Sequence, residues 1–299
     1  MKPITPAPQP WRSLLPIMAL LVGCGGGGGA SAAPSPAPVP APVPAPAPLP
    51  TNWTLVWSDE FDGAAGTTPS AANWNSETGN AERDGWGNHE LEYYTAAARN
   101  AALDGNGQLV ITAEKATNPG PCWNGAQCAY TSARLTTAGK VTFTYGKVEA
   151  RIQFPGGQGI WPAFWALGDS GSWPAMGEID ILEYVGKTPN AVYGTAHGPG
   201  YSGANGIGKP LNSATPWADS WHTFTLIKRP NLMVWLVDGV ELQRLTPASL
   251  PAGSTWAFER KFFVILNLAV GGDWPGSPDA STVFPAKMKV DWVRIYKEQ

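Results

Sequence analysis

Short runs of β-branched and aromatic residues, separated by glycine-containing turns, recur from residue 51 to the end of the chain. They occupy residues 53–57, 108–113, 146–154, 221–227, 232–237, 262–268 and 288–296. The dipeptide Asp238-Gly239 favours a hairpin between the 232–237 run and residues 240–242. No helical period is sustained, and no internal repeat is visible. The pattern predicts an all-β fold made of two antiparallel sheets, one of which can bend into a groove that binds a polymer.

The composition supports this fold class and excludes several kinds of function. The chain has 299 residues with 35 Gly, 30 Pro and 15 Trp, only 14% charged residues and a net charge of -3. These values do not fit a coiled coil, a polybasic nucleic-acid binder or a small disulfide-stapled protein. We therefore expect no nucleic-acid partner and a single large domain over residues 51–299.

The N-terminal residues have the features of an export signal. Lys2 and Arg12 precede an apolar stretch, residues 14–22, that is too short to span a bilayer as a helix. The run Leu21 to Cys24 resembles the lipobox of bacterial lipoproteins. This resemblance implies cleavage after residue 23, a lipid on Cys24, and anchoring in the cell envelope, at the outer membrane or the cell surface, since Gly25 is not aspartate. The alternative is an ordinary secretory signal with an incidental cysteine, which would give a secreted protein.

Residues 24–50 have the composition of a tether. Glycines at 25–29 are followed by a proline at every even position from Pro34 to Pro50. Alternating prolines favour polyproline II, so this segment would hold a domain roughly 50 Å from its anchor, at ~3.1 Å per residue. A proline-rich ligand for another domain is the alternative. Removal of residues 1–23 leaves 18 basic and 23 acidic residues, so the exported protein is mildly acidic.

Two further cysteines, Cys122 and Cys128, lie in a short turn-rich segment. Because an exported chain meets an oxidising compartment, we predict that they form a disulfide. Closing so short a loop would contribute only about 2 kcal/mol in the chain-entropy model, so the bond would shape a loop without holding up the fold. A zinc site is the weaker interpretation, since no histidines stand at ligand spacing.

Three acidic residues stand together in the segment Glu178-Ile179-Asp180-Ile181-Leu182-Glu183. Side chains alternate along a strand, so Glu178 and Asp180 share one face and Glu183 would point to the other. A β-bulge between Asp180 and Glu183 would bring all three to the same face, which should then line a solvated cleft. An exposed edge strand would also explain alternating acids. The nearby tryptophans of residues 160–168 favour the cleft, because flat apolar rings beside paired carboxylates suit the binding and cleavage of sugars.

The 178–183 segment resembles the E-x-D-x-x-E signature of glycoside hydrolase family 16, in its bulged, laminarinase-like form. Further blocks in family order extend the resemblance over residues 52 to 297. They are Trp57 to Phe61, His89 to Thr95, Trp161 to Trp165, Gly194 to Tyr201, Asn267 to Gly272 and Val290 to Tyr296. The resemblance implies a β-jelly-roll sandwich whose concave face carries the substrate cleft.

The same resemblance assigns roles to the acids. It makes Glu178 the nucleophile, Glu183 the general acid/base and Asp180 the residue between them that tunes their protonation. A retaining glycosidase needs one ionised and one protonated carboxyl group, and it needs no cofactor. The charge of Glu178 would raise the pKa of Glu183 in the required direction.

Further positions follow from the resemblance for substrate and metal. Contacts with sugar are expected at Trp161, Trp165, Trp173, His197, Asn88, Glu92, Arg151 and Trp274, although buried tryptophans are also common in the core of a large sandwich. A structural calcium on the convex side is expected at Glu60, Gly105 and Asp291, since oxygen ligands suit a hard cation. The alternative is that Asp291 only bonds a nearby backbone group.

The resemblance points to a polysaccharide substrate and to endo-acting hydrolysis of β-1,3-glucosidic bonds in laminarin-type glucans, by a monomeric enzyme. The unbulged signature of lichenases is absent, and an acidic domain is a poor match for sulfated polymers. Three alternatives stay open: a family 16 hydrolase for another polysaccharide such as mixed-linkage glucan or agar-type galactan, a transglycosylase, and a non-catalytic β-glucan-binding protein. The binding protein is disfavoured because all three acids are present.

Overall fold

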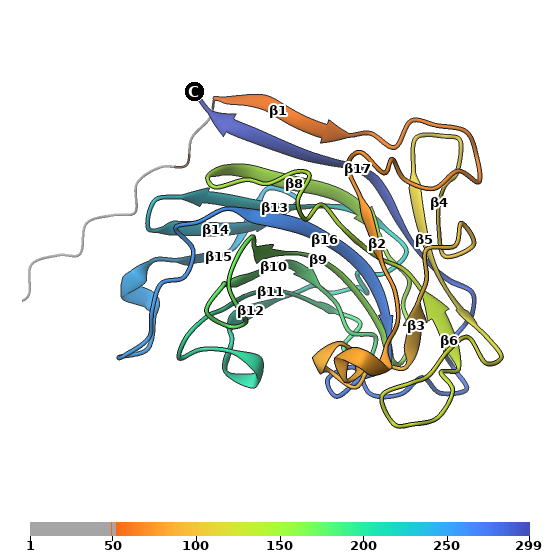
Figure 1. Ribbon diagram of the computed structural model, residues 1–299. Coiled ribbons are helices and arrows are strands. Elements are labelled where there is room, and N and C mark those ends of the chain that lie inside the picture. Colours follow the sequence, from red (N-terminus) through yellow and green to blue (C-terminus); the bar gives the residue numbers. More distant parts are fainter. Residues whose placement is uncertain (1–48, 50–51) are drawn as a thin grey trace, which may run out of the picture. The chain divides into compact units, whose positions relative to one another are not determined.

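The computed structural model describes residue 49 and residues 52–299 of the chain (Figure 1). The signal peptide predicted over residues 1–23, its lipid-bearing Cys24 and the tether of residues 24–50, residue 49 excepted, lie outside the described residues. Among the residues described, no helix is long and apolar enough to cross a membrane.

Residues 52–299 form two β-sheets. The ten-stranded outer sheet has the order β15-β14-β13-β8-β17-β5-β6-β3, with β1 paired to β17 and β4 paired to β5. Its strands are β1 (Trp53–Asp59), β3 (Glu92–Tyr94), β4 (Ala101–Leu103), β5 (Leu109–Lys115), β6 (Tyr130–Ser132), β8 (Gly146–Gln153), β13 (Trp221–Arg229), β14 (Leu232–Val237), β15 (Val240–Leu245) and β17 (Ala286–Glu298).

The seven-stranded inner sheet has the order β12-β11-β10-β9-β16-β7-β2. Its strands are β2 (Asn75–Glu77), β7 (Arg134–Thr136), β9 (Ile160–Gly168), β10 (Glu178–Glu183), β11 (Ala191–His197), β12 (Ile207–Asn212) and β16 (Phe262–Val270). Every pairing among the described strands is antiparallel except β3 with β6. The prediction of an all-β antiparallel sandwich is therefore confirmed.

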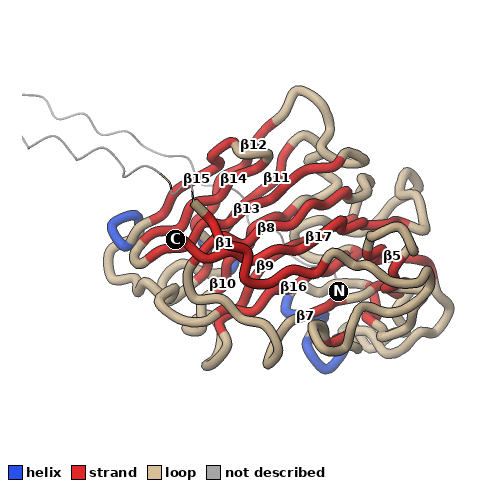
Figure 2. Tube along the Cα trace, turned by 90° about the horizontal axis from the view of Figure 1, so that it is seen from above, coloured by secondary structure: helices blue, strands red, loops and turns tan. Residues whose placement is uncertain are grey.

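The inner sheet is strongly curved, and the outer sheet covers its convex side (Figure 1). Short 3-10 helical turns lie only in connections between strands: η1 (Ala81–Arg83), η2 (Gly85–Gly87), η3 (Gly203–Asn205) and η4 (Pro247–Ser249) (Figure 2). Among the strands of residues 52–299, none forms a layer over the concave side of the inner sheet, and a long ligand can lie on such a face.

The core lies between the sheets and follows from the alternation of the strands. In β8, Val148, Ala150 and Ile152 are fully buried while their chain neighbours are half-buried. Trp235 of β14 and Phe164 of β9 are also fully buried in the same cluster. The predicted hairpin is present as β14, the turn at residues 238–239 and β15.

Candidate active site

Strand β10 carries the three acids, and its pairing is irregular at the predicted place. Glu178 pairs with His197 of β11 and Asp180 pairs with Thr195, but the next paired residue is Glu183, opposite Tyr193. Two residues separate Asp180 from Glu183 on β10 against one on β11, so a bulge restores Glu183 to the face of the other two acids. All three line one groove on the concave side.

The bulge is supported from the core side of the sheet. Trp235, on the opposite sheet, donates a hydrogen bond from its indole Nε1 to the backbone carbonyl of Asp180 at 2.8 Å. Ile179, Ile181 and Leu182 are buried in the sandwich. The apolar residues of the segment thus anchor β10 between the sheets, while its acids face the groove.

Glu178 lies beside two groups that favour its ionised form. The indole Nε1 of Trp173 donates a hydrogen bond to its Oε2 at 2.7 Å, and Nε2 of His197 lies 3.9 Å from its Oε1. Burial and then the charge of Asp180 raise the pKa of Glu178 to about 8, whereas His197 and Trp173 act in the opposite direction. Asp180 is 3.1 Å from Nε2 of His197, and burial raises its pKa to about 8.

Glu183 has the surroundings of a proton-holding group. Burial raises its pKa well above the ordinary value, and the charge of Asp180 adds to the increase. The Thr195 hydroxyl donates a hydrogen bond to its Oε2 at 3.3 Å. Three carboxyl groups in one groove cannot all be ionised cheaply, so burial and the charges of Asp180 and Glu178 favour the protonated form of Glu183. A carboxyl group that holds its proton is what the general acid of a two-carboxylate glycosidase requires.

The groove is wider than the sequence analysis indicated. Its lining residues come from β7, β9, β10, β16 and the loop before β3: Trp86, Asn88, Glu90, Arg134, Trp161, Ala163, Trp165, Glu178, Asp180, Glu183 and Asn267. Sequence reasoning missed Trp86, Glu90, Arg134 and Asn267. Asn267 had a visible signal, since it is a lone amide in the otherwise apolar strand β16.

Arg134 and Asn267 hold Trp165 in place. The Arg134 guanidinium lies 4.6 Å from the Trp165 ring centre and 4.7 Å from that of Trp86. The Trp165 indole N–H donates to Oδ1 of Asn267 at 2.7 Å, and Nδ2 of Asn267 donates to the Tyr94 hydroxyl at 3.1 Å. The ring is therefore fixed in the groove by contacts on its edge and face, which suits a rigid sugar platform.

Five more of the residues predicted to contact sugar gather around the acids. Trp161 lines the groove in a small cluster outside the main core, and its ring meets Trp274 edge to face at 5.5 Å. Trp173 is half exposed beside Glu178. His197 contacts the acids, and Asn88 lies at the groove, where its Nδ2 donates to Glu90 at 3.2 Å.

The structure places two of the residues predicted to contact sugar away from the groove. Glu92 is completely buried, and its Oε2 accepts a hydrogen bond from the backbone N–H of Val270 at 2.6 Å. Arg151 belongs to β8 of the outer sheet, where it binds Asp291 at 2.8 Å and stacks on Trp221. Glu92 faces the interior and Arg151 lies on the other sheet, so neither reaches the groove. Glu90, two residues before Glu92, takes that place.

The residues predicted to hold calcium do not fit that role as the structure arranges them. Both carboxylate oxygens of Glu60 accept hydrogen bonds from Arg294, at 2.9 and 2.7 Å, and Oδ2 of Asp291 accepts one from Arg151. A Cβ built on Gly105 would lie 3.1 Å from Ala65, so Gly105 packs against that residue. Because the carboxylates are already neutralised by arginines, they are poor ligands for a cation. The partner of Asp291 in the structure is the Arg151 side chain, where the alternative expected a backbone group.

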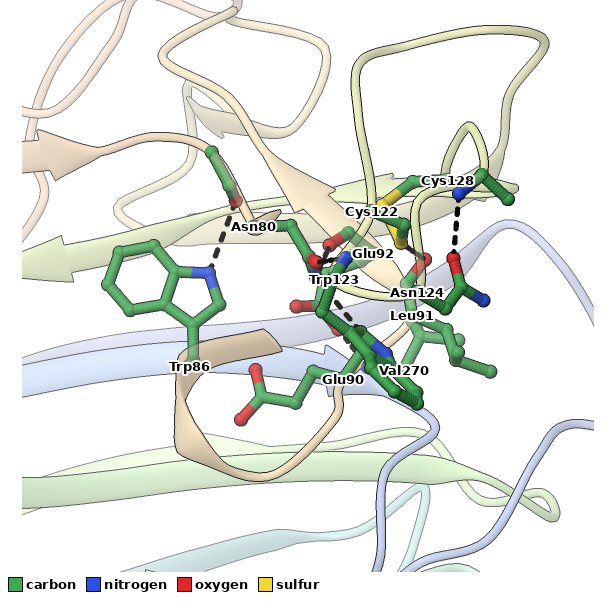
Figure 3. Close-up of a disulfide and its surroundings, with 12 residues drawn as sticks. Asn80, Trp86, Glu90, Leu91, Glu92, Cys122, Trp123, Asn124, Cys128 and Val270 are labelled. Atoms are coloured by element: carbon green, nitrogen blue, oxygen red, sulfur yellow. Dashed lines mark hydrogen bonds between the residues drawn. A yellow bond between two sulfur atoms is a disulfide. The ribbon is translucent and has the colours of Figure 1, made fainter. Parts of the chain in front are cut away.

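The remaining cysteine pair is joined as predicted. Cys122 and Cys128 form a disulfide within the connection between β5 and β6, close to the loop that carries Trp86 and Glu90 (Figure 3).

A curved β-sandwich with three acids close together in a groove lined by aromatic rings has the features of a glycoside hydrolase. Comparison with known proteins names its family. Residues 89–294 match the model for glycosyl hydrolases family 16. A β-glucanase of Rhodothermus marinus is 38% identical, over 82% of this chain and 86% of the relative.

Two solved structures agree with this. An endo-β-1,3-glucanase of Pyrococcus furiosus is 45% identical with a TM-score of 0.75, over 82% of this chain and 94% of that one. The laminarinase catalytic domain of Thermotoga maritima is 43% identical with a TM-score of 0.75, over 83% of this chain and 99% of that one. The chain belongs to glycoside hydrolase family 16, with laminarinases and other β-glucanases among its relatives.

Proposed function

We propose that this protein is an endo-acting, retaining glycoside hydrolase that cleaves β-1,3-glucosidic bonds in laminarin-type glucans. The observation that carries the proposal is the placement of Glu178, Asp180 and Glu183 on one face of the bulged strand β10. The groove lies on the concave face of a curved sheet, and such a face suits the binding of an internal stretch of a polymer and hence endo action.

The chemistry is assigned to the protein's own carboxyl groups. Glu178, held by the Trp173 indole N–H, attacks the anomeric carbon and forms a glycosyl-enzyme ester as the glycosidic C–O bond breaks. Glu183 donates its proton to the departing oxygen. In the second half, Glu183 takes a proton from water, the resulting hydroxide equivalent attacks the anomeric carbon, and Glu178 leaves as a carboxylate. Asp180, between them, modulates both proton affinities through its charge.

The β-1,3 linkage is supported by the relatives, which include an endo-β-1,3-glucanase and a laminarinase at 43–45% identity. The same catalytic residues would serve a transglycosylase or a hydrolase of mixed-linkage glucan or agar-type galactan. A non-catalytic glucan-binding protein fits less well, because both residues of the acid pair are present and face the same groove.

The experiment is parallel incubation of the full chain with laminarin, barley mixed-linkage glucan and agarose, with the products separated by chromatography. We expect short oligosaccharides of several lengths from laminarin, little from agarose, and none from laminarin with Glu178→Gln. Cleavage of agarose alone would reject β-1,3-glucan as the substrate, and release of only one small product would reject endo action. If Glu178→Gln cleaves laminarin as fast as the wild type, the assignment of Glu178 as the nucleophile is rejected.

The cellular site is proposed from the sequence alone. A lipid on Cys24, followed by the proline-rich segment to residue 50, would hold the enzyme at the cell envelope with its groove free to meet a polymer. A monomer suffices for the proposed chemistry, since a retaining glycosidase needs only one pair of carboxyl groups.

A further inference from the structure

One wall of the groove is a loop in an unfavourable backbone conformation. The rim loop, residues 84–91, supplies Trp86, Asn88 and Glu90 to the groove. Asp84, Trp86 and His89 have φ values of 51°, 60° and 55°, in the left-handed region that side-chain-bearing residues avoid. A loop that contains several such residues keeps its conformation only if its surroundings impose it.

The disulfide hairpin, residues 120–128, packs against the rim loop (Figure 3). The Trp123 ring lies 4.2 Å from the His89 ring, centre to centre. A Cβ built on Gly85 would lie 2.8 Å from Cδ1 of Trp123, so the indole rests directly on the backbone of the rim loop. Trp123 therefore covers the rim loop at two points.

Asn80 joins the two segments by hydrogen bonds. It is fully buried, and its Oδ1 accepts the backbone N–H of Trp123 at 2.8 Å. Its Nδ2 donates to the carbonyls of Glu90 at 2.9 Å and Glu92 at 2.8 Å, and its own carbonyl accepts the N–H of Gly85 at 3.1 Å. One buried amide thus connects the hairpin to both ends of the rim loop.

The disulfide fixes the part of the hairpin that makes these contacts. The backbone N–H of Cys122 donates to Ala126 at 2.8 Å, and that of Cys128 donates to Gly120 at 2.9 Å. Trp123 lies inside the loop that the Cys122–Cys128 bond closes. Its orientation toward Asn80 and Gly85 is consequently restricted by a covalent link.

A second support holds the opposite side of the rim loop. The N–H of Leu91 donates to Val270 at 2.8 Å, that of Asp273 donates to Asn88 at 2.9 Å, and Nδ1 of His89 is 2.9 Å from Asp273. These contacts do not include Gly85, which the hairpin covers through Trp123. The neighbouring Trp86 is also held by its own side chain, since its indole N–H donates to the carbonyl of Gly79 at 3.1 Å.

We propose that Trp123 and the Cys122–Cys128 disulfide position the sugar-binding wall formed by Trp86, Asn88 and Glu90, acting through Asn80 and Gly85. They are positioning residues, since they do not line the groove themselves. The inference rests on the proposed function for its substrate, but the conformation of the rim loop is measurable without any substrate.

The test compares Cys122→Ser/Cys128→Ser, Trp123→Ala and Trp123→Phe in the full chain. Trp292→Ala, a half-buried indole of the outer sheet stacked on Arg294, is the matched control. Two measurements are made: kcat and KM for laminarin, and hydrogen–deuterium exchange of residues 84–91 and of β10 in the free protein.

We expect the double serine variant and Trp123→Ala to raise KM about tenfold, as for the loss of one or two hydrogen bonds, with kcat changed less than about twofold. Exchange should rise in residues 84–91 and stay unchanged in β10. Trp123→Phe should keep KM and the exchange of residues 84–91 close to the wild-type values, because its ring still covers Gly85 and His89. Trp292→Ala should change neither KM nor exchange of the rim loop.

Two results would overturn the inference. Unchanged exchange and KM would mean that the contacts with residues 270–273 suffice. Exchange rising equally in β10, with kcat falling and KM constant, would mean that the hairpin only stabilises the fold. If the wild type cleaves no laminarin, the proposed function fails, and the exchange measurement still decides whether the hairpin positions the loop.

Discussion

Trp173 and Glu178 are joined by a 2.7 Å hydrogen bond from the indole N–H to a carboxylate oxygen, although the Trp173 side chain is half exposed. The bond favours the ionised form of a carboxyl group whose pKa burial raises to about 8. Trp173→Phe keeps the ring and removes the donor, so Glu178 should lose its proton only at higher pH. A hydrogen bond to a charged group is worth ~1.5–3 kcal/mol, so the acidic limb of the kcat/KM profile should move up by about one to two pH units.

The pH profile of kcat/KM on laminarin measures this shift, and Trp221→Phe on the outer sheet serves as control. An acidic limb that stays in place, with activity reduced equally at every pH, would show that Trp173 acts only as a sugar platform.

Glu183 should limit the stability of the protein. Its folded pKa is raised above the ordinary value of 4.5, so between these two values the folded state binds more protons than the unfolded state. The contribution of Glu183 to stability is therefore greatest below its unfolded pKa, and it is lost as the pH rises toward the folded pKa. Glu183→Gln removes this loss and should raise Tm at pH 7 by a few degrees, at roughly 2–4 °C per kcal/mol.

Thermal unfolding of wild type and Glu183→Gln at pH 4 and pH 7 tests this sign. The gain should be larger at pH 7, and Glu114→Gln on β5 should show no comparable gain. A gain that is larger at pH 4 would reject the assignment of a raised pKa to Glu183.

Removal of calcium should leave the protein unaffected. Arg294 binds both oxygens of Glu60 and Arg151 binds Asp291, so the predicted ligands are already paired. Tm in EDTA should equal Tm in calcium to within about 1 °C, well under the shift expected for 1 kcal/mol. A lower Tm in EDTA that calcium restores would demonstrate a bound ion.

Replacement of Cys24 should detach the protein from membranes. Cys24→Ser removes the thiol that would carry the lipid, so fractionation of expressing cells should move the protein from the membrane pellet to the soluble fraction. The double variant of Cys122 and Cys128 is the control and should stay in the pellet. Membrane retention of Cys24→Ser would instead favour an uncleaved or differently anchored N-terminus.

Much of the fold was predictable because its signals are local. The runs at residues 232–237 and 262–268 became β14 and β16 with small changes of boundary, since β-branched residues and turn dipeptides lie close in sequence. The bulge in β10 was also predictable, because only a register shift places Asp180 and Glu183 on the same face.

The rest of the groove depends on contacts between distant segments. Strand β3 begins at Glu92, after a left-handed residue at His89, so strand alternation could not show that Glu90 faces the groove and Glu92 the interior. The half-buried position of Arg151 in β8 follows the alternation expected of a strand. Nothing local in the sequence indicates which of the two sheets that strand joins. Arg134 is placed by its stacking between Trp86 and Trp165, which no spacing in the sequence encodes.

The central claim is that Glu178 and Glu183 together cleave β-1,3-glucan with retention of configuration. Proton NMR of laminarin during the first minutes of digestion by the full chain measures the anomer of each new reducing end before mutarotation. We expect β-anomers to appear first and α-anomers to follow only at the rate of mutarotation. Initial release of α-anomers would contradict the covalent intermediate on Glu178.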